Sequence, residues 1–294
     1  MPMKRRFMLT AVALLVATAA FLGCLAAFAD ASTPEVGVNV GGVAAPTPEA
    51  IVARGALLVG TAGDYRPMSF LDPETGRYVG FDAELAEDLG KALGVAVEYV
   101  PTSWPTLMED TLAGKFDLAI CGITVTDARR EAALMSQGYL GNGKTVLCRR
   151  EDAEKYTSLE AINRPEVRVM ENPGGLNEKF ARENLPDATL IIHDVNQEIP
   201  GLVASGEADV MITEILEAGY YVGVDDRLAA PLIYEPFTRG ELGVLMPKGS
   251  EALLDYVNAF IEAEKASGRI KALAEQYIYG GIDRAGSDAL PDAA

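Results

Sequence analysis

The fold of this chain is decided by one stretch, Asn172-Pro173-Gly174-Gly175-Leu176-Asn177-Glu178-Lys179-Phe180-Ala181-Arg182. The run before it, Val167-Arg168-Val169-Met170, alternates in hydrophobicity and predicts a strand. Pro173 and the two glycines predict a tight turn, where the backbone can approach a ligand closely. A helix follows over residues 178–184, with Asn177 as its expected N-cap. A strand, a glycine turn and a helix start leave backbone N–H groups unpaired, and such groups suit an anion.

Glu178 lies in the first turn of this expected helix, beside any anion that the turn would hold. One interpretation is that the acid only complements the positive end of the helix dipole. The other interpretation is that it acts on a bound ligand. The residues by themselves leave both interpretations open.

Strands and helices alternate on both sides of this stretch, which predicts mostly parallel sheets with crossover connections. A helix over Glu49–Arg54 and a strand over Ala56–Thr61 come first, and Ser103 and Thr126 are expected caps of two further helices. The pattern repeats after residue 145 and therefore predicts two lobes. Ligands bind outside the carboxyl ends of strands in such sheets. The residues expected directly after strands are Asp64, Thr102, Thr124, Gly174 and Thr213.

The N-terminus indicates export. Three basic residues, Lys4 to Arg6, precede the apolar run Leu9–Leu25, and Ala27-Phe28-Ala29 forms a small-x-small cleavage site. We therefore expect a signal peptide over residues 1–29 and a periplasmic location. An uncleaved anchor is the alternative, because the apolar run approaches spanning length. Lipid attachment at Cys24 is less favoured, because Leu22 is bulkier than such sites usually have.

The mature chain is strongly acidic. Loss of the three basic residues of the signal peptide moves the formal charge from −18 to −21. Such a charge argues against nucleic acid as a partner, and any anion site must be built locally. The single histidine, His193, excludes a multi-histidine metal site, so we expect no metal and no cofactor. Cys121 and Cys148 are expected as buried thiols, although their pairing stays open.

An ordered set of motifs resembles the family 3 periplasmic amino-acid-binding proteins. The motifs are Gly80-Phe81-Asp82, Gly114-Lys115-Phe116-Asp117 and the run Gly122–Arg129. The resemblance covers roughly residues 50–282 and implies an α/β, type II periplasmic binding protein fold, with two α/β lobes around a central cleft and two crossing strands. Lobe 1 would comprise residues 49–144 and 240–282, and lobe 2 residues 145–239. A flexible linker over 30–48 and a disordered tail over 283–294 would flank them.

The resemblance also implies a ligand site for a small carboxylate or amino acid. The position of Arg129 grips the carboxylate of the ligand, with help from Thr124, and a guanidinium suits that task. Glu214 stands where these binders hold an amino group. Lys144 lies at the predicted lobe crossing, where a structural and a ligand-binding role are both open. The remaining ligand-binding candidates are Gly122, Asp64, Tyr65, Trp104, Gly175 and Asn177.

Three stretches resemble the catalytic branch of this superfamily, the cyclohexadienyl dehydratases. They are Gly63–Pro67, Thr102–Met108 and the opening stretch over 172–182. The resemblance implies that Glu178 is the general acid that removes water, with carbon dioxide, from prephenate or arogenate to give phenylpyruvate or phenylalanine. Such an acid must stay protonated near neutral pH, and this requires burial that raises its pKa.

One departure leaves a second class of function open. The residue at the position of Leu176 is normally a threonine, and leucine cannot donate the hydrogen bond that a hydroxyl gives. The alternative function is therefore a periplasmic amino-acid-binding protein that delivers its ligand to an ABC permease.

Overall fold

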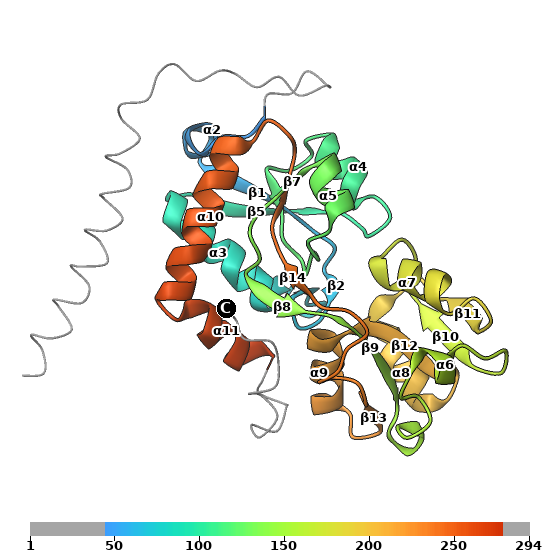
Figure 1. The fold of residues 1–294 in the computed structure, drawn as a ribbon. Helices are drawn as coiled ribbons and strands as arrows, with labels where there is room; N and C mark the ends of the chain where they lie inside the picture. The colour runs from blue at the N-terminus through green and yellow to red at the C-terminus, as the bar shows by residue number, and fades with distance from the viewer. Residues whose placement is uncertain (1–44, 279–294) are drawn as a thin grey trace, which may run out of the picture. The chain divides into compact units, whose positions relative to one another are not determined.

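A computed structural model describes residues 45–278 of the chain (Figure 1). The expected signal peptide, most of the expected linker and the expected tail lie outside these residues. The first helix, α2 (Pro48–Arg54), begins one residue before the expected start, because Thr47 caps it by accepting the Ala50 N–H. Gly55 ends this helix with a φ of 83°, a conformation that favours glycine.

The first sheet has the strand order β5-β1-β6-β15-β7. Its centre is parallel, because β1 pairs in that sense with both β5 and β6, whereas β15 runs antiparallel to its neighbours. The strands are Ala56–Thr61 (β1), Ala96–Pro101 (β5), Leu118–Ala119 (β6), Leu134–Met135 (β7) and Leu245–Met246 (β15).

The second sheet has the order β11-β10-β12-β9-β13, in which β9 runs antiparallel to β12 and β13. The strands are Lys144–Arg149 (β9), Arg168–Glu171 (β10), Thr189–Ile192 (β11), Val210–Glu214 (β12) and Leu228–Ala229 (β13). This sheet is covered on both faces. Val146 and Ile212 belong to one apolar cluster, and their neighbours Leu147 and Met211 belong to another.

Two short strands join the sheets. β8 (Leu140–Asn142) leads from the first sheet into β9, and β14 (Gly240–Leu242) leads back towards β15. They pair antiparallel, with Gly240 opposite Asn142. This is the expected α/β architecture of two lobes with two crossing strands. A third, small sheet is formed by β2 (Asp64–Tyr65), β3 (Ser69–Leu71) and β4 (Tyr78–Val79).

Helices cover both sheets. Around the first sheet are α3 (Phe81–Leu93), α4 (Leu107–Leu112), α5 (Asp127–Ala132), α10 (Glu251–Ala266) and α11 (Arg269–Tyr277). Around the second are α6 (Leu159–Ile162), α7 (Leu176–Asn184), α8 (Ile199–Ser205) and α9 (Ile215–Val224), with short 3-10 turns at Arg150–Asp152 and Asn196–Glu198. No helix within residues 45–278 has the length and apolar character needed to cross a bilayer.

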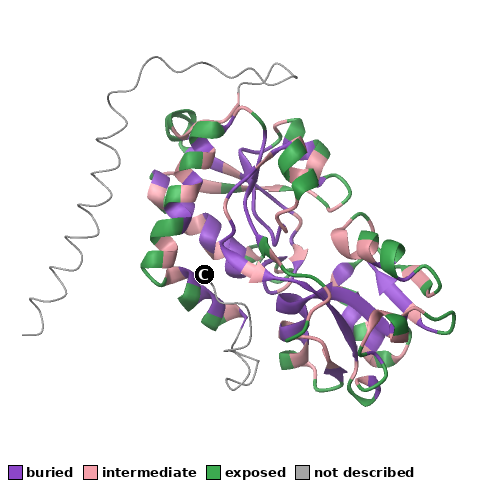
Figure 2. Cartoon of the chain, in the orientation of Figure 1, coloured by how far each residue is buried: buried purple, intermediate pink, exposed green. Residues whose placement is uncertain are grey.

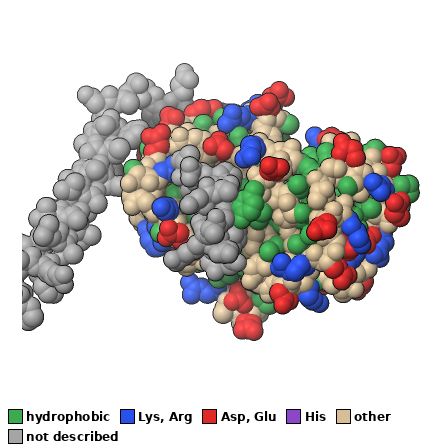
Figure 3. Space-filling model, turned by 60° about the horizontal axis from the view of Figure 1, so that its bottom comes forward, with side chains coloured by type: hydrophobic (Ala, Val, Ile, Leu, Met, Phe, Trp, Pro, Cys, Tyr) green, Lys and Arg blue, Asp and Glu red, His purple; other side chains and the backbone are tan. Residues whose placement is uncertain are grey.

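The apolar stripe of α3 shows why this helix forms and where it packs. Phe81, Leu85, Leu89 and Leu93 recur every fourth residue and are all buried in the cluster that lies between α3, α10 and the first sheet. Figure 2 shows that buried residues follow the strands and the inward faces of the helices. Acidic and basic side chains are interspersed over the face drawn in Figure 3.

Some local expectations are wrong. Ser103 does not cap α4, because its carbonyl accepts the N–H groups of Thr106 and Leu107 in a turn, and the helix begins only at Leu107. The run Phe116–Ile120 predicts a strand of five residues, but β6 is limited to Leu118–Ala119. Thr126 does cap α5, where its hydroxyl accepts the Arg129 N–H. Cys121 and Cys148 are buried free thiols.

We predict that Asp209→Asn destabilises the second lobe. The carboxylate of Asp209 accepts hydrogen bonds from the backbone and guanidinium of Arg168 and from Arg149, which join β10 to the start of β12. Burial alone would raise the pKa of Asp209, but these two arginines lower it to about 2. With allowance for solvent screening, the substitution should lower the free energy of unfolding by about 1–2 kcal/mol at pH 7.

Urea unfolding of both proteins from pH 7 down to pH 2 checks this prediction. A carboxyl group with a depressed pKa stabilises the fold above its unfolded pKa, and it loses this effect as the pH falls through its folded value. The difference between wild type and variant should therefore narrow below pH 4. A difference that is independent of pH would contradict the assignment to the ionised group.

Candidate functional site

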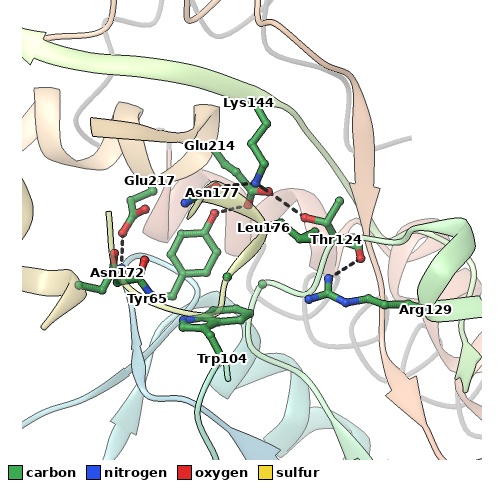
Figure 4. Close-up of a pocket in the computed structure, with 13 residues that line it drawn as sticks. Tyr65, Trp104, Thr124, Arg129, Lys144, Asn172, Leu176, Asn177, Glu214 and Glu217 are labelled. Atoms are coloured by element: carbon green, nitrogen blue, oxygen red, sulfur yellow. Dashed lines mark hydrogen bonds and ion pairs between the residues drawn. The ribbon is translucent and has the colours of Figure 1, made fainter. Parts of the chain in front are cut away.

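A cavity lies between the two lobes, and each lobe contributes side chains to it (Figure 4). Segments that flank the first sheet supply Tyr65, Trp104, Gly122, Thr124 and Arg129. Segments of the second supply Lys144, Asn172, Gly175, Leu176, Asn177, Asn196, Glu214 and Glu217. Every ligand-binding candidate from the sequence except Asp64 lines this cavity.

The opening stretch reaches the cavity through the start of α7. The helix begins at Leu176 with Gly175 as its N-cap, so the expected cap at Asn177 is wrong. Asn177 lies inside the first turn, and its side-chain oxygen accepts a hydrogen bond from Lys144 Nζ instead. Gly174 has a φ of 80°, and a Cβ there would lie 2.6 Å from Pro105. The turn must therefore carry glycine to pack so closely against the other lobe.

Glu178 is not among the side chains that line the cavity, and the expected rise of its pKa is wrong. Its Oε2 accepts the Gly174 N–H at 2.6 Å, and its Oε1 accepts Arg182 Nε at 2.8 Å. The Gly174 hydrogen bond, followed by the bond and charge of Arg182, lowers the pKa of Glu178. Glu178 is thus an internal anion that satisfies the glycine turn and the helix start. The first of the two interpretations from the sequence fits this geometry.

Glu214 accepts four hydrogen bonds inside the protein. Its Oε1 accepts Lys144 Nζ at 2.7 Å and the Thr124 hydroxyl at 2.8 Å. Its Oε2 accepts the Tyr65 hydroxyl and Asn142 Nδ2, both at 2.7 Å. Burial by itself would raise the pKa of Glu214, but the charge and hydrogen bond of Lys144, with the two hydroxyl donors, lower it. Glu214 is therefore a buried carboxylate whose partners come from both lobes and from a crossing strand.

Arg129 extends from α5 to the cavity. Its Nη1 donates to the Thr124 carbonyl at 2.7 Å, and within residues 45–278 no carboxylate forms an ion pair with it. The remaining N–H groups of the guanidinium are thus available to a carboxylate of a ligand. This position agrees with the role that the resemblance implies for Arg129.

Aromatic rings form one wall of the cavity. Tyr65 and Trp104 meet edge to face, with their ring centroids 6.1 Å apart. Asp64 does not line the cavity but accepts Trp104 Nε1 at 3.0 Å and so orients the indole. A Cβ at Gly122 would lie 2.2 Å from the Tyr65 ring, and its N–H donates to the buried Asp82. The absence of a side chain at Gly122 therefore lets Tyr65 lie where it does.

Two residues of the cavity, Asn196 and the chemically more important Glu217, were not predicted from the sequence. Glu217 lies in the first turn of α9, is 1% exposed, and accepts hydrogen bonds from Asn196 Nδ2 at 3.0 Å and from the Thr213 hydroxyl. Burial, reinforced by the charges of Asp64 and Glu214, raises its pKa to about 8, although the two hydrogen bonds oppose this shift. The signal in the sequence was a lone acid within the apolar run Ile215-Leu216-Glu217-Ala218.

The lining charges make the cavity locally positive. Arg129 and Lys144 contribute two positive charges, and Glu214 contributes one negative charge. Glu217 is neutral below its pKa of about 8. A chain with a formal charge of −18 therefore carries a locally built site that suits an anion.

Residues 57–280 match the family described as bacterial extracellular solute-binding proteins, family 3. The chain is 35% identical to the cyclohexadienyl dehydratase of Pseudomonas aeruginosa over 257 residues, which are 87% of this chain and 92% of that protein.

Two solved structures are also similar. An ancestral amino-acid-binding protein, a precursor of cyclohexadienyl dehydratase, is 37% identical with a TM-score of 0.73, over 79% of this chain and 99% of that one. An ancestral cyclohexadienyl dehydratase is 51% identical with a TM-score of 0.50, over 80% of this chain and 98% of that one.

We predict that Glu217→Gln stabilises the protein in alkaline solution. Glutamine resembles the neutral acid and has no charge to bury. An acid whose pKa rises from 4.5 to about 8 on folding costs stability as the pH increases between those values. The variant should therefore exceed the wild type in free energy of unfolding by up to about 4 kcal/mol at pH 9, and by little at pH 5.

Urea unfolding at both pH values tests this, with Glu262→Gln on the exposed face of α10 as the matched control. The control should show no such difference between pH 5 and pH 9. A Glu217→Gln effect of equal size at the two pH values would remove the burial of a neutral acid as its explanation.

Proposed function

This chain belongs to family 3 of the bacterial extracellular solute-binding proteins, and we propose that it is a lyase of the cyclohexadienyl dehydratase type, with Glu217 as its general acid. The observation that carries this proposal is the buried carboxyl group of Glu217 in a cavity that also holds Arg129. A transport receptor has no need of a protonated acid, whereas elimination of water from a ring requires one. The dehydratase relatives support the same conclusion.

The proposed reaction removes water and carbon dioxide from prephenate, arogenate or both. Glu217 donates its proton to the ring hydroxyl, which leaves as water, while the bond to the ring carboxylate breaks and carbon dioxide departs. The electrons of that bond enter the ring and make it aromatic. Glu217 is left as a carboxylate and takes a proton from solvent before the next turnover. The products are phenylpyruvate or phenylalanine.

The other lining residues bind and orient the substrate in this proposal. Arg129 pairs with a carboxylate of the ligand, and the start of α7 adds backbone N–H groups. Tyr65, Trp104 and Leu176 enclose the ring with apolar surface and exclude water. The family that the chain resembles normally carries a threonine at the position of Leu176. In this chain the residue therefore offers the substrate an apolar contact in place of a hydrogen bond. No step requires a metal or an organic cofactor.

The site of action that we propose is the periplasm. The family is extracellular by description, and the signal peptide expected over residues 1–29 agrees, although it lies outside the described residues.

The second candidate is an amino-acid receptor that serves an ABC permease. The amino-acid-binding precursor structure supports it, because it shares the fold at 37% identity. A receptor would hold an amino acid tightly and give no product from prephenate. One turnover assay therefore separates the two candidates.

We predict that Glu217→Gln lowers kcat for prephenate by at least about 1,000-fold, because glutamine cannot donate the proton. In the wild type, kcat should fall as the pH rises through about 8, because Glu217 then loses its proton. The measurement is direct detection of phenylpyruvate, with Glu262→Gln as the control. Glu178→Gln should cost less than about tenfold, because that residue only holds the turn.

Two outcomes would count against this assignment. Retained turnover in Glu217→Gln would remove it as the acid. A loss in Glu178→Gln as large as in Glu217→Gln would return the catalytic role to Glu178.

We predict that Arg129→Met weakens carboxylate binding by about 10- to 100-fold, because a charge-assisted, two-point contact is lost. Calorimetry with phenylpyruvate measures the change. Arg130→Met is the matched control, since Arg130 lies next in the same helix but is exposed and does not line the cavity. Equal affinities of the Arg129→Met variant and the wild type would show that Arg129 does not hold the ligand.

A further inference from the structure

We infer that the cavity selects carboxylates that carry no ammonium group, so that prephenate is its substrate in preference to arogenate. The inference rests on the proposed function for the names of the two substrates. They differ at one position, where prephenate has a keto oxygen and arogenate a protonated amine.

The acid that should hold an amine is already occupied. A carboxylate has about four lone-pair directions, and Glu214 uses them on Lys144, Thr124, Tyr65 and Asn142. Glu214 is also only 5% exposed, so a fifth donor has little surface to approach. An ammonium group could pair with it only by displacing one of these donors, which would then be buried without a partner.

Lys144 already supplies the positive charge that an amine would bring. Its Nζ lies 2.7 Å from Glu214 Oε1, and its second partner is the side-chain oxygen of Asn177. The residue is 7% exposed, so its charge is poorly screened. The ammonium of an amino acid next to Glu214 would therefore lie beside a buried ammonium of like charge.

The other acids do not replace Glu214. Glu217 could offer a negative charge only by releasing its proton, and the proposed reaction needs that proton. Asp64 does not line the cavity and is bound to Trp104. Within residues 45–278, the cavity thus presents no ionised acid that is free to receive an amine.

A keto oxygen, in contrast, meets donors. Asn177 gives its side-chain oxygen to Lys144, which leaves its amide N–H groups for a ligand. Asn172 lines the same cavity with a second amide (Figure 4). Either side chain can donate to a keto oxygen, which accepts hydrogen bonds and carries no charge to repel Lys144.

The test compares two ligands that the protein does not turn over. Phenylpyruvate and L-phenylalanine differ only in the keto oxygen and the ammonium group, and calorimetry on the wild type measures both. We expect phenylpyruvate to bind at least about tenfold more tightly, because a buried charge without a partner is strongly unfavourable. Equal affinities, or tighter binding of phenylalanine, would overturn the inference.

A variant assigns the preference to Lys144. In Lys144→Met, Glu214 loses its internal cation and can accept an ammonium group, so the ratio of the two affinities should fall at least about tenfold. Lys91→Met, which removes an exposed lysine from an ion pair with Asp88 on α3, should leave the ratio unchanged. An unaltered ratio in a folded Lys144→Met protein would remove Lys144 as the cause.

The same experiments distinguish this inference from the proposed function. If prephenate gives no product while phenylpyruvate still binds more tightly than phenylalanine, the dehydratase proposal fails and the selectivity stands. If prephenate and arogenate give product with equal kcat/KM, the selectivity fails and the dehydratase proposal stands. A kcat/KM at least about tenfold higher for prephenate supports both.

Discussion

The buried carboxylate of Glu214 is the constraint on which the site depends. A carboxylate that leaves water must find donors for both oxygens, and Glu214 finds them in Tyr65 and Thr124 of the first lobe, in Lys144 of the second and in Asn142 of a crossing strand. The acid therefore fixes the lining of the cavity from several directions at once. It also neutralises one of two lining cations, so that Arg129 remains for an anion. The positive character of the cavity and its lack of a place for an amine both follow from these four bonds.

Two glutamates three residues apart show how environment separates their chemistry. Glu214 ends β12 and has a cation at 2.7 Å, whereas Glu217 lies in the first turn of α9 and receives only neutral donors. Both are buried, so the difference comes from their partners and not from their depth. The charge of Lys144 keeps Glu214 ionised, while the two neutral hydrogen bonds of Glu217 offset desolvation only in part, so that Glu217 holds its proton to a pKa of about 8. A pair of acids with their pKa values moved apart is the arrangement that separates a structural anion from a proton donor.

Glu178 supplies a carboxylate to one of the backbone N–H groups in the glycine turn before α7. Glu178 reaches back to the Gly174 N–H and forward to Arg182, so one donor of the turn is already used. The turn still shapes the cavity, because Gly174 packs against Pro105 and the next three residues line the cavity wall. Within this stretch, Glu178 therefore stabilises the turn and the helix start, while Gly175, Leu176 and Asn177 form the wall of the cavity.

The sequence by itself determined the two-lobe α/β fold, the stripe of α3, the cap of α5 and the gathering of Arg129, Thr124, Trp104 and Gly175 at one cavity. The fold and the helix features follow from local periodicity and turn chemistry, whereas the gathering of these four residues is what the resemblance of the ordered motifs implies. Only the tertiary structure decided which acid is protonated. The pKa of Glu217 is set mainly by desolvation, which comes from packing and leaves no local pattern in the sequence. The partners that lower the pKa of Glu178, Gly174 and Arg182, lie only four residues away along the chain, but the structure is needed to show that they bind this carboxylate. The four hydrogen bonds that occupy Glu214 could not be predicted from the sequence either, because their donors lie 70 to 149 residues away along the chain.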